Sequence, residues 1–256
     1  MDDALRSLEG AFVVRSSEVN RYGQARIETF FDYFQEMAGA HADKLGCGLR
    51  MLQEHQQAWV LLRVRLDVFR TPRLGDTVRV RTWPSGFKRL YALREGLFFD
   101  NDGEIGRITS YWALLDVTRM RPLRLPEALA VPLPDNSSLP QYFDLDSKVM
   151  AKGHDHPMTC VVPEHFIDIN GHTNNARYAS LVGDWLAKNS GEPQEITSIT
   201  AHFLQGTPAW SNITISGHCE DDGHFSVEIV KDGTEPVAVY VAEGNYKSNG
   251  EFKCSR

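Results

Sequence analysis

The chain has 256 residues, 42% hydrophobic and 24% charged, a balance typical of a globular protein with a buried core. Its net charge of −7, without a basic run that alternates with aromatic residues, argues against nucleic acid as a partner. No apolar run reaches the roughly 18 residues that a membrane-spanning helix needs. The acidic start at Met1 is unlike a signal peptide, and the four cysteines are widely spaced, as in proteins that keep reduced thiols. These features predict a cytoplasmic protein without a membrane span.

The first half of the chain begins with a helical pattern and continues with strands. Apolar side chains recur at spacings of three and four from Phe30 to Leu45, and Gly46 follows where a helix would end. Turns are expected at residues 84–86 and 100–103, which are rich in Pro, Gly, Asp and Asn. Runs of β-branched and aromatic residues predict four strands, at Ala58–Phe69, Thr77–Trp83, Leu90–Phe99 and Ile105–Leu115.

The second half repeats this order of elements. A helical face runs from Tyr178 to Leu186, with Thr173 or Asn174 as the N-cap and Gly191 just past the end. Four strands are again predicted, at Ile196–Phe203, Ile213–Cys219, His224–Lys231 and Pro236–Tyr246. An antiparallel sheet that packs its apolar face on one long helix is a stable two-layer unit. The sequence therefore predicts an α+β fold with two such units, 1–128 and 155–256, joined by a linker at 129–154.

The segment with the most candidate catalytic side chains precedes the second helix, from Asp168 to Asn175. Asp168, Asn170 and His172 alternate, so an extended backbone would point all three in one direction. His172 can accept a proton near neutral pH, Asn170 can orient a water molecule, and Asp168 can hold the imidazole. Free N–H groups at the helix N-terminus could stabilise an oxyanion. This combination suits acyl transfer to water, although Asp and Asn before a helix also serve as caps and turn formers.

Other chemistries are less well supported by the sequence. His154, Asp155, His156 and His165 could suggest a metal site, but they lie in a polar stretch without further ligand spacing, so no metal is expected. The chain lacks the G-x-S-x-G motif of serine hydrolases and the glycine-rich motifs of nucleotide-binding proteins. We therefore expect no cofactor.

The segment Asp168–Tyr178 resembles the D-x-N-x-H-x-N-N-x-x-Y signature of the acyl-acyl carrier protein (acyl-ACP) thioesterases of plants and bacteria. The similarity extends across nearly the whole chain, including the helix segment from Gln35 to Ala42 and the close of the first half at Trp112–Asp116. The resemblance implies a tandem (double) hot-dog fold with one active site, in the second half. It places the catalytic residues at Asp168, Asn170 and His172. It also implies that Phe34, Met37, Ala38 and His41 border the acyl chain.

One segment departs from the family pattern. The family usually has an acidic residue, often followed by Cys, about 34 residues after the histidine, and here Gly206 and Thr207 stand at those positions. The usual carboxylate and thiol are therefore missing. We expect Gly206→Ala to be mildly harmful and Gly206→Glu to be no better, because a lone Glu would lack its supporting residues.

The resemblance implies release of free fatty acid from acyl-ACP at the end of fatty acid biosynthesis. Leu61–Arg124 carries 13 Lys and Arg against 7 Asp and Glu, and Lys88, Arg89, Arg119, Arg121 and Arg124 are candidates to dock the acidic carrier protein. Two other functions stay open: an acyl-CoA thioesterase on the same fold, and an acyl-binding module with little turnover. The sequence also leaves a homodimer open.

Overall fold

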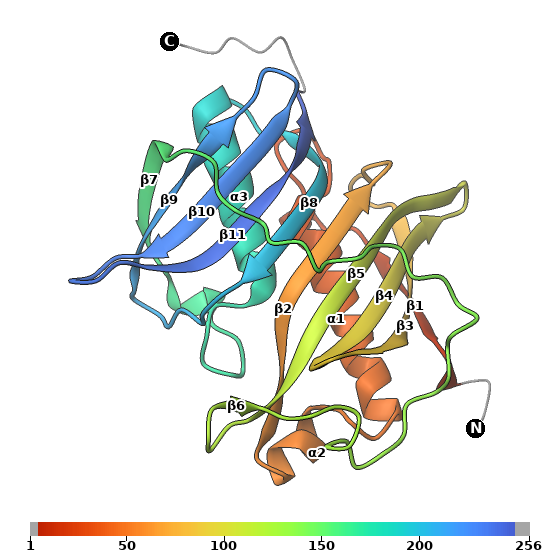
Figure 1. Cartoon of the computed structure of the whole chain (residues 1–256). Helices are drawn as coiled ribbons and strands as arrows, with labels where there is room; N and C mark the ends of the chain where they lie inside the picture. Colours follow the sequence, from red (N-terminus) through yellow and green to blue (C-terminus); the bar gives the residue numbers. More distant parts are fainter. Residues whose placement is uncertain (1–4, 249–256) are drawn as a thin grey trace. The chain divides into compact units, whose positions relative to one another are not determined.

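The structure is a computed structural model that describes residues 5–248 (Figure 1). Its described residues form two compact units. The first contains the chain up to Val14 together with Asp32–Leu145, and the second contains Arg15–Phe31 together with the chain from Asp146. The division differs from the expected domain bounds, because residues 15–31 belong with the second unit. Tyr22 illustrates the reason: its hydroxyl donates a hydrogen bond to Glu192 Oε2 at 3.0 Å.

The first unit contains one antiparallel sheet with the strand order β1-β3-β4-β5-β2 (Figure 1). The long helix α1 (Ile27–Lys44) starts in the segment that belongs to the second unit and continues into the first, where the short helix α2 (Leu49–Glu54) follows it. A two-residue strand, β6 (Arg121–Pro122), pairs with β5. The five strands of the sheet are β1 (Leu8–Val13), β2 (Gln57–Val68), β3 (Thr77–Lys88), β4 (Tyr91–Asp100) and β5 (Gly103–Asp116).

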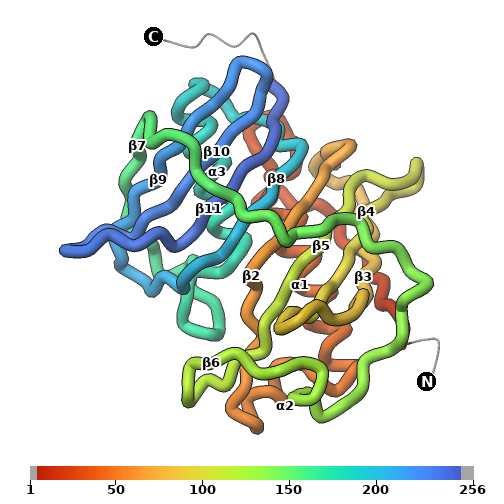
Figure 2. Tube along the Cα trace, in the orientation of Figure 1, coloured from red at the N-terminus to blue at the C-terminus, as the bar shows by residue number. Residues whose placement is uncertain are grey.

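The second unit repeats this plan, as the trace in Figure 2 allows the reader to follow. Its antiparallel sheet has the order β7-β9-β10-β11-β8, which matches the order of the first sheet strand for strand. The helix α3 (Asn175–Ser190) precedes four of the five strands. The strands are β7 (Asp155–Val161), β8 (Glu195–Phe203), β9 (Asn212–Cys219), β10 (His224–Lys231) and β11 (Val237–Lys247). The predicted repeat of a helix and four strands is present, and the structure adds the edge strands β1 and β7, the helix α2 and the short strand β6.

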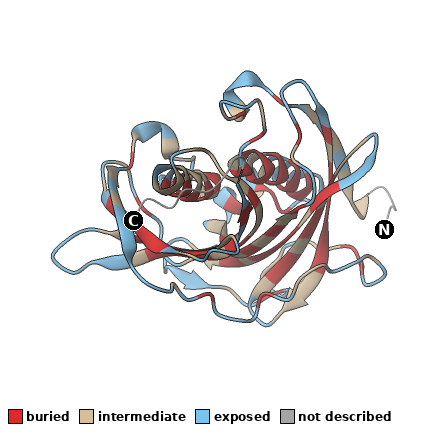
Figure 3. Cartoon of the chain, turned by 90° about the horizontal axis from the view of Figure 1, so that it is seen from above, coloured by how far each residue is buried: buried red, intermediate tan, exposed pale blue. Residues whose placement is uncertain are grey.

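The core of each unit lies between its helix and its sheet, where the buried residues gather in Figure 3. In the first unit, glycines let α1 approach the strands closely. A Cβ at Gly96 on β4 would lie 2.7 Å from the ring of Phe34, and one at Gly10 on β1 would lie 2.6 Å from Met37 Sδ. In the second unit, the fully buried Trp185 of α3 donates its indole N–H to the carbonyl of His156 at 2.9 Å.

The turn expected at residues 84–86 is instead part of β3. The pairing of β3 with β4 shifts register between Pro84 and Gly86, and Gly86 has a φ of 128°. Proline lacks the N–H that a regular ladder needs, and a bulge accommodates it. The strand therefore continues to Lys88, and the chain reverses at Arg89 and Leu90.

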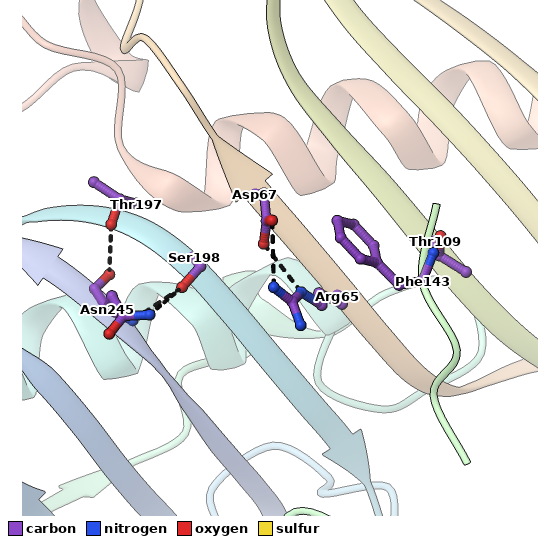
Figure 4. Close-up of polar contacts among 7 residues, drawn as sticks. All are labelled: Arg65, Asp67, Thr109, Phe143, Thr197, Ser198 and Asn245. Atoms are coloured by element: carbon purple, nitrogen blue, oxygen red, sulfur yellow. Dashed lines mark hydrogen bonds and ion pairs between the residues drawn. The ribbon is translucent and has the colours of Figure 1, made fainter. Parts of the chain in front are cut away.

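The expected linker is fixed along the first sheet over much of its length. Side chains of the sheet accept hydrogen bonds from its backbone N–H groups: Glu95 from Tyr142 at 3.3 Å, and Thr109 from Phe143 at 3.2 Å. Figure 4 shows Phe143 beside Arg65, whose guanidinium lies 4.4 Å from the ring centroid and also pairs with Asp67. This segment belongs to the first unit up to Leu145. It is therefore a packed part of that unit and not a flexible tether.

Side chains also join neighbouring strands in the second unit. Asn245 on β11 donates its amide to Ser198 Oγ on β8 at 2.9 Å, and Thr197 donates its hydroxyl to the carbonyl of Asn245 at 3.3 Å (Figure 4). These bonds lie where the pairing of the two strands shifts register.

Glu28, in the first turn of α1, is a half-buried acid. Burial raises its pKa to about 7, and nearby Asp184 adds to the effect, while a bond to its own backbone N–H and the charges of Arg26 and Arg177 oppose it. A carboxyl whose pKa is higher in the folded state stabilises the fold below its unfolded pKa, and this contribution is lost as the pH rises through 7. The ionised form of Glu28 therefore costs stability at pH 8.

We expect Glu28→Gln to increase the free energy of unfolding at pH 8 by up to about 3 kcal/mol, at 1.36 kcal/mol per pKa unit. The variant and the parent should converge below about pH 4.5, where both side chains are neutral. Urea unfolding at several pH values measures the difference. Exposed Glu36 on the same helix provides the control, since Glu36→Gln should give no such pH dependence. A Glu28→Gln effect that is the same at every pH would contradict the assignment.

Candidate functional site

The segment that carries Asp168, Asn170 and His172 is a tight turn. Its ends are joined by a bridge between Ile167 and Thr173, and the N–H of Asp168 donates to the carbonyl of His172 at 2.9 Å. The carbonyl of Asp168 accepts from Gly171 at 3.0 Å, and Gly171 has the φ of 77° that favours glycine. The expected extended backbone is therefore wrong: the three side chains project from a turn, in which alternation does not set their direction.

Asp168 helps to form this turn. Its Oδ1 accepts the backbone N–H of Asn170 at 2.8 Å, the Asx arrangement typical of aspartate in turns. Within the described residues, its carboxylate makes no hydrogen bond to the ring of His172. Asn170 and His172 are both exposed at the surface of the second unit. Asp168 therefore fixes the backbone that presents these two side chains to solvent.

The turn leads directly into α3. Asn174 is the N-cap, and its side chain accepts the N–H of Ala176 at 2.9 Å. The N–H of Thr173 donates to the carbonyl of Thr207, and the N–H of Asn174 donates to the carbonyl of Phe166. The N–H of Arg177 donates to the carbonyl of Asn174. These donors are occupied, so they are not available for an oxyanion as the sequence suggested. By contrast, the amide group of Asn170 and the N–H of His172 have no acceptor among residues 5–248.

Gly206 lies directly against the ring of His172. A Cβ built on Gly206 would lie 2.5 Å from Cδ2, 2.8 Å from Cγ and 3.1 Å from Nε2 of the histidine. The φ of Gly206 is not positive, so its backbone would accept other residues and only the space is restrictive. The position at which the family pattern has an acid therefore has no room for a side chain while His172 keeps this place.

Thr207 forms hydrogen bonds to the end of the turn that carries His172. Its side chain is fully buried, and its carbonyl accepts both the N–H and the hydroxyl of Thr173 at 2.8 Å. Burial raises the pKa of Tyr178, so its hydroxyl stays protonated and donates to Thr207 Oγ1 at 2.9 Å. The sequence pointed to Gly206 and Thr207 only as departures from a pattern. Their contacts join the segment that follows β8 to the turn before α3 and to Tyr178, so they could not be read from the sequence.

We expect Thr207→Val to lower the free energy of unfolding by about 1–3 kcal/mol, because it leaves the buried hydroxyl of Tyr178 without its acceptor. Chemical denaturation measures the loss. Tyr178→Phe is the matched control, and the double variant should lose less than the sum of the two single losses, since both remove one bond. Additive losses would show that the bond contributes nothing of its own.

The four residues expected to border the acyl chain lie on α1 and are buried in the first unit. His41 Nε2 lies 3.0 Å from the carbonyl of Leu5, and its Nδ1 lies 3.2 Å from an Nη atom of Arg94. Burial, together with the charge of Arg94, lowers the pKa of His41 to about 4, so the imidazole is neutral at physiological pH. Phe34, Met37 and Ala38 are as buried as ordinary core residues. The position of Arg94 was not anticipated from the sequence.

Two of the residues considered as metal ligands, His154 and Asp155, lie near other side chains. Asp155 Oδ2 lies 3.1 Å from Nδ1 of His218, while His154 lies 4.0 Å from Glu228. Over the described part of the chain, no group of three or more His, Cys, Asp or Glu residues is close enough to hold a metal ion.

Among residues 5–248, no helix has the length and the apolar character needed to cross a membrane.

Comparison with known sequences shows what the first half of the chain is similar to. Residues 7–133 match the acyl-ACP thioesterase N-terminal domain. Among curated proteins, the chain is 25% identical over 215 residues to an oleoyl-acyl carrier protein thioesterase, chloroplastic, of Coriandrum sativum, covering 77% of this chain and 58% of that protein. It is 30% identical over 208 residues to an acyl-[acyl-carrier-protein] hydrolase, chloroplastic, of Cuphea viscosissima, covering 75% of this chain and 49% of that one. The chain thus spans about half to three fifths of these relatives.

Comparison with solved structures shows a shared fold over nearly the whole chain. An acyl-ACP thioesterase from Bacteroides thetaiotaomicron superposes with a TM-score of 0.84 at 22% identity, covering 96% of this chain and all of that one. The 12:0-ACP thioesterase from Umbellularia californica gives a TM-score of 0.75 at 20% identity, covering 94% and 97% of the two chains.

Proposed function

We propose that the chain belongs to the acyl-ACP thioesterase family, and that it hydrolyses fatty acyl thioesters of the acyl carrier protein and releases free fatty acid. The observation that carries the proposal is the turn at 168–172, which presents an imidazole and a carboxamide together at the surface of the second unit. The family match supports the reaction class, and this turn supplies groups that can perform it.

In the proposed reaction, His172 accepts a proton from water as the water oxygen attacks the thioester carbonyl. The carbonyl oxygen becomes negatively charged, and in this proposal the amide of Asn170 and the N–H of His172 donate hydrogen bonds to it. The C–S bond then breaks, the acid leaves, and the thiolate takes up the proton from His172. Asp168 acts as a positioning residue, because it bonds to the backbone of the turn and not to the imidazole.

We assign the fold as a double hot-dog. The support is the identical strand order of the two sheets, each combined with one long helix, together with the superposition on known thioesterases. The second hot-dog then carries the catalytic turn. Phe34, Met37, Ala38 and His41 on α1 are proposed to line the acyl chain, and the neutral His41 with Arg94 would give that lining a polar end.

A comparison of carriers tests this function. The same acyl chain is offered on ACP and on CoA, and released fatty acid is measured. We expect a higher kcat/KM with ACP. Preference for CoA would assign the chain as an acyl-CoA thioesterase on the same fold, and the absence of product from both would contradict hydrolysis. A cytoplasmic location stays a proposal, since the plant relatives named above are described as chloroplastic.

The absence of the family acid favours one second candidate, an acyl-binding protein with little turnover. Gly206 leaves no carboxylate at that position, and the adjacent Thr207 hydroxyl already accepts a bond from Tyr178. In this alternative, a labelled acyl-ACP would bind with a measurable Kd but release no more than one equivalent of fatty acid.

A further inference from the structure

The turn between β5 and β6 presents an unusual surface. The pairing of Asp116 with Arg121 closes a four-residue turn at 117–120, and Asp116 Oδ1 accepts the N–H groups of Thr118 and Arg119 at 2.9 Å. The turn also bonds to the loop between α2 and β2, since the N–H of Val117 donates to the carbonyl of Gln56 at 2.9 Å. These bonds hold the turn in a defined shape, and we call residues 117–124 the arginine turn.

Apolar side chains stand at the tip of this turn. Met120 is 71% exposed and Val117 is 45% exposed. Met120 has a φ of 51°, the left-handed region that a non-glycine residue adopts at a cost of about 1 kcal/mol or more. Both the left-handed backbone and the exposure of the apolar methionine side chain to water lower the stability of the fold. Such a feature is typical of a surface that another molecule covers, and methionine and arginine are both enriched in interfaces.

The arginines of the turn differ from most others in the basic stretch. Elsewhere in the stretch, Arg70 after β2 forms two bonds of 2.6 and 2.8 Å with Asp100, and Arg107 on β5 bonds to Glu104 at 2.7 Å. In the arginine turn, Arg119 is 78% exposed and lies 3.8 Å from Asp116, while Arg124 is 84% exposed and lies 4.0 Å from Glu127.

Arg121 makes no side-chain hydrogen bond or ion pair within residues 5–248, and it is also exposed. Lys88, which the sequence also suggested for docking, is paired with Asp144 at 3.1 Å. Internal pairing thus accounts for several basic residues of the stretch, whereas the three arginines of the turn keep their charge available to a partner.

We propose that the arginine turn docks the acyl carrier protein, with Met120 and Val117 against an apolar patch of the carrier and the three arginines against its acidic side chains. This inference rests on the proposed function, because it takes the carrier as the substrate's partner. Charge complementarity argues for an acidic protein, and two apolar side chains suit the small centre of a transient interface. A partly covered tip would also explain why an exposed methionine is retained in a strained conformation.

Two measurements test the docking site. The first is the Kd of labelled ACP, which does not depend on catalysis. The second is kcat/KM for acyl-ACP and for the same acyl chain on pantetheine. The triple variant Arg119→Glu, Arg121→Glu, Arg124→Glu should weaken Kd and lower kcat/KM for acyl-ACP by about 10-fold or more at low salt. The loss should shrink above about 0.1 M salt, where exposed charges are screened beyond about 10 Å. The pantetheine substrate should be unaffected.

The control reverses three exposed basic residues elsewhere, Arg21, Arg73 and Lys148, and so changes the net charge equally. It should change Kd by no more than about two-fold, whereas Met120→Ser should weaken Kd several-fold without salt dependence.

Equal losses of affinity in both triple variants would overturn the proposal, as would an unchanged Kd in the arginine variant. Loss of binding to anionic phospholipid vesicles without a change in Kd for ACP would assign the turn to a membrane surface instead. A chain that binds ACP through this turn but hydrolyses neither substrate would contradict the proposed function and leave the docking site standing.

Discussion

Replacement of His172 by alanine is expected to lower kcat by about 10²–10⁴, the usual contribution of a general base. His172 is exposed at the end of a turn that is held by backbone bonds and by Asp168, so its side chain contributes little to the fold. We therefore expect the free energy of unfolding to change by less than about 0.5 kcal/mol, as for ordinary surface substitutions. Steady-state hydrolysis of acyl-ACP and chemical denaturation measure the two quantities.

His154 provides a matched control for this experiment. It is an exposed histidine of the same unit and lies 4.0 Å from Glu228. His154→Ala should keep the parental kcat. Near-parental activity of the His172 variant would remove this residue from the mechanism, and equal losses in the two variants would point to a general effect of losing a histidine.

Gly206→Ala is expected to lower kcat by about 10- to 100-fold, because a displacement of about 1 Å in a catalytic group has effects of that size. The added Cβ would lie 2.5 Å from the His172 ring, so the imidazole must move. The structure thus makes this substitution more harmful than the sequence alone suggested. Backbone strain is not the cause, since the φ of Gly206 is not positive.

Gly206→Glu should be no better than Gly206→Ala, since it introduces the same Cβ and a longer side chain at a site without supporting partners. Gly233→Ala is the control: Gly233 lies in an exposed turn of the same unit, where the nearest atom to a new Cβ is 3.9 Å away. It should leave kcat unchanged. A large gain from Glu over Ala would show that the acid of the family pattern still has a working place beside His172.

Periodicity and turn residues were sufficient to predict most of the fold. The helix that ends before Gly46, the N-cap and Gly191 at the two ends of α3, and the eight main strands follow from local patterns, and all are present. The elements that were missed have weak local signals. β1 and β7 have exposed alternate positions, and α2 has only six residues. The association of residues 15–31 with the second unit depends on tertiary contacts such as Tyr22 with Glu192, which no local pattern encodes.

The residues of the candidate site remain a prediction from the sequence, and the structure changes the geometry that was expected of them. Alternation of Asp168, Asn170 and His172 suggested a strand, yet Gly171 and the Asx bond of Asp168 form a turn instead. Gly171 and Asp168, which favour a turn, were both visible in the sequence. Their preference for a turn outweighs an alternating pattern of only three polar residues. The contact of Gly206 with His172 joins residues 34 positions apart, so only the folded chain reveals it.

The most direct test is the amount of fatty acid that one molecule of the protein releases from acyl-ACP. We predict many equivalents of free fatty acid per protein molecule, with the multiple turnovers abolished or strongly slowed in His172→Ala. Release that stops at or below one equivalent in the parental protein, despite measurable binding of acyl-ACP, would contradict hydrolysis as its activity.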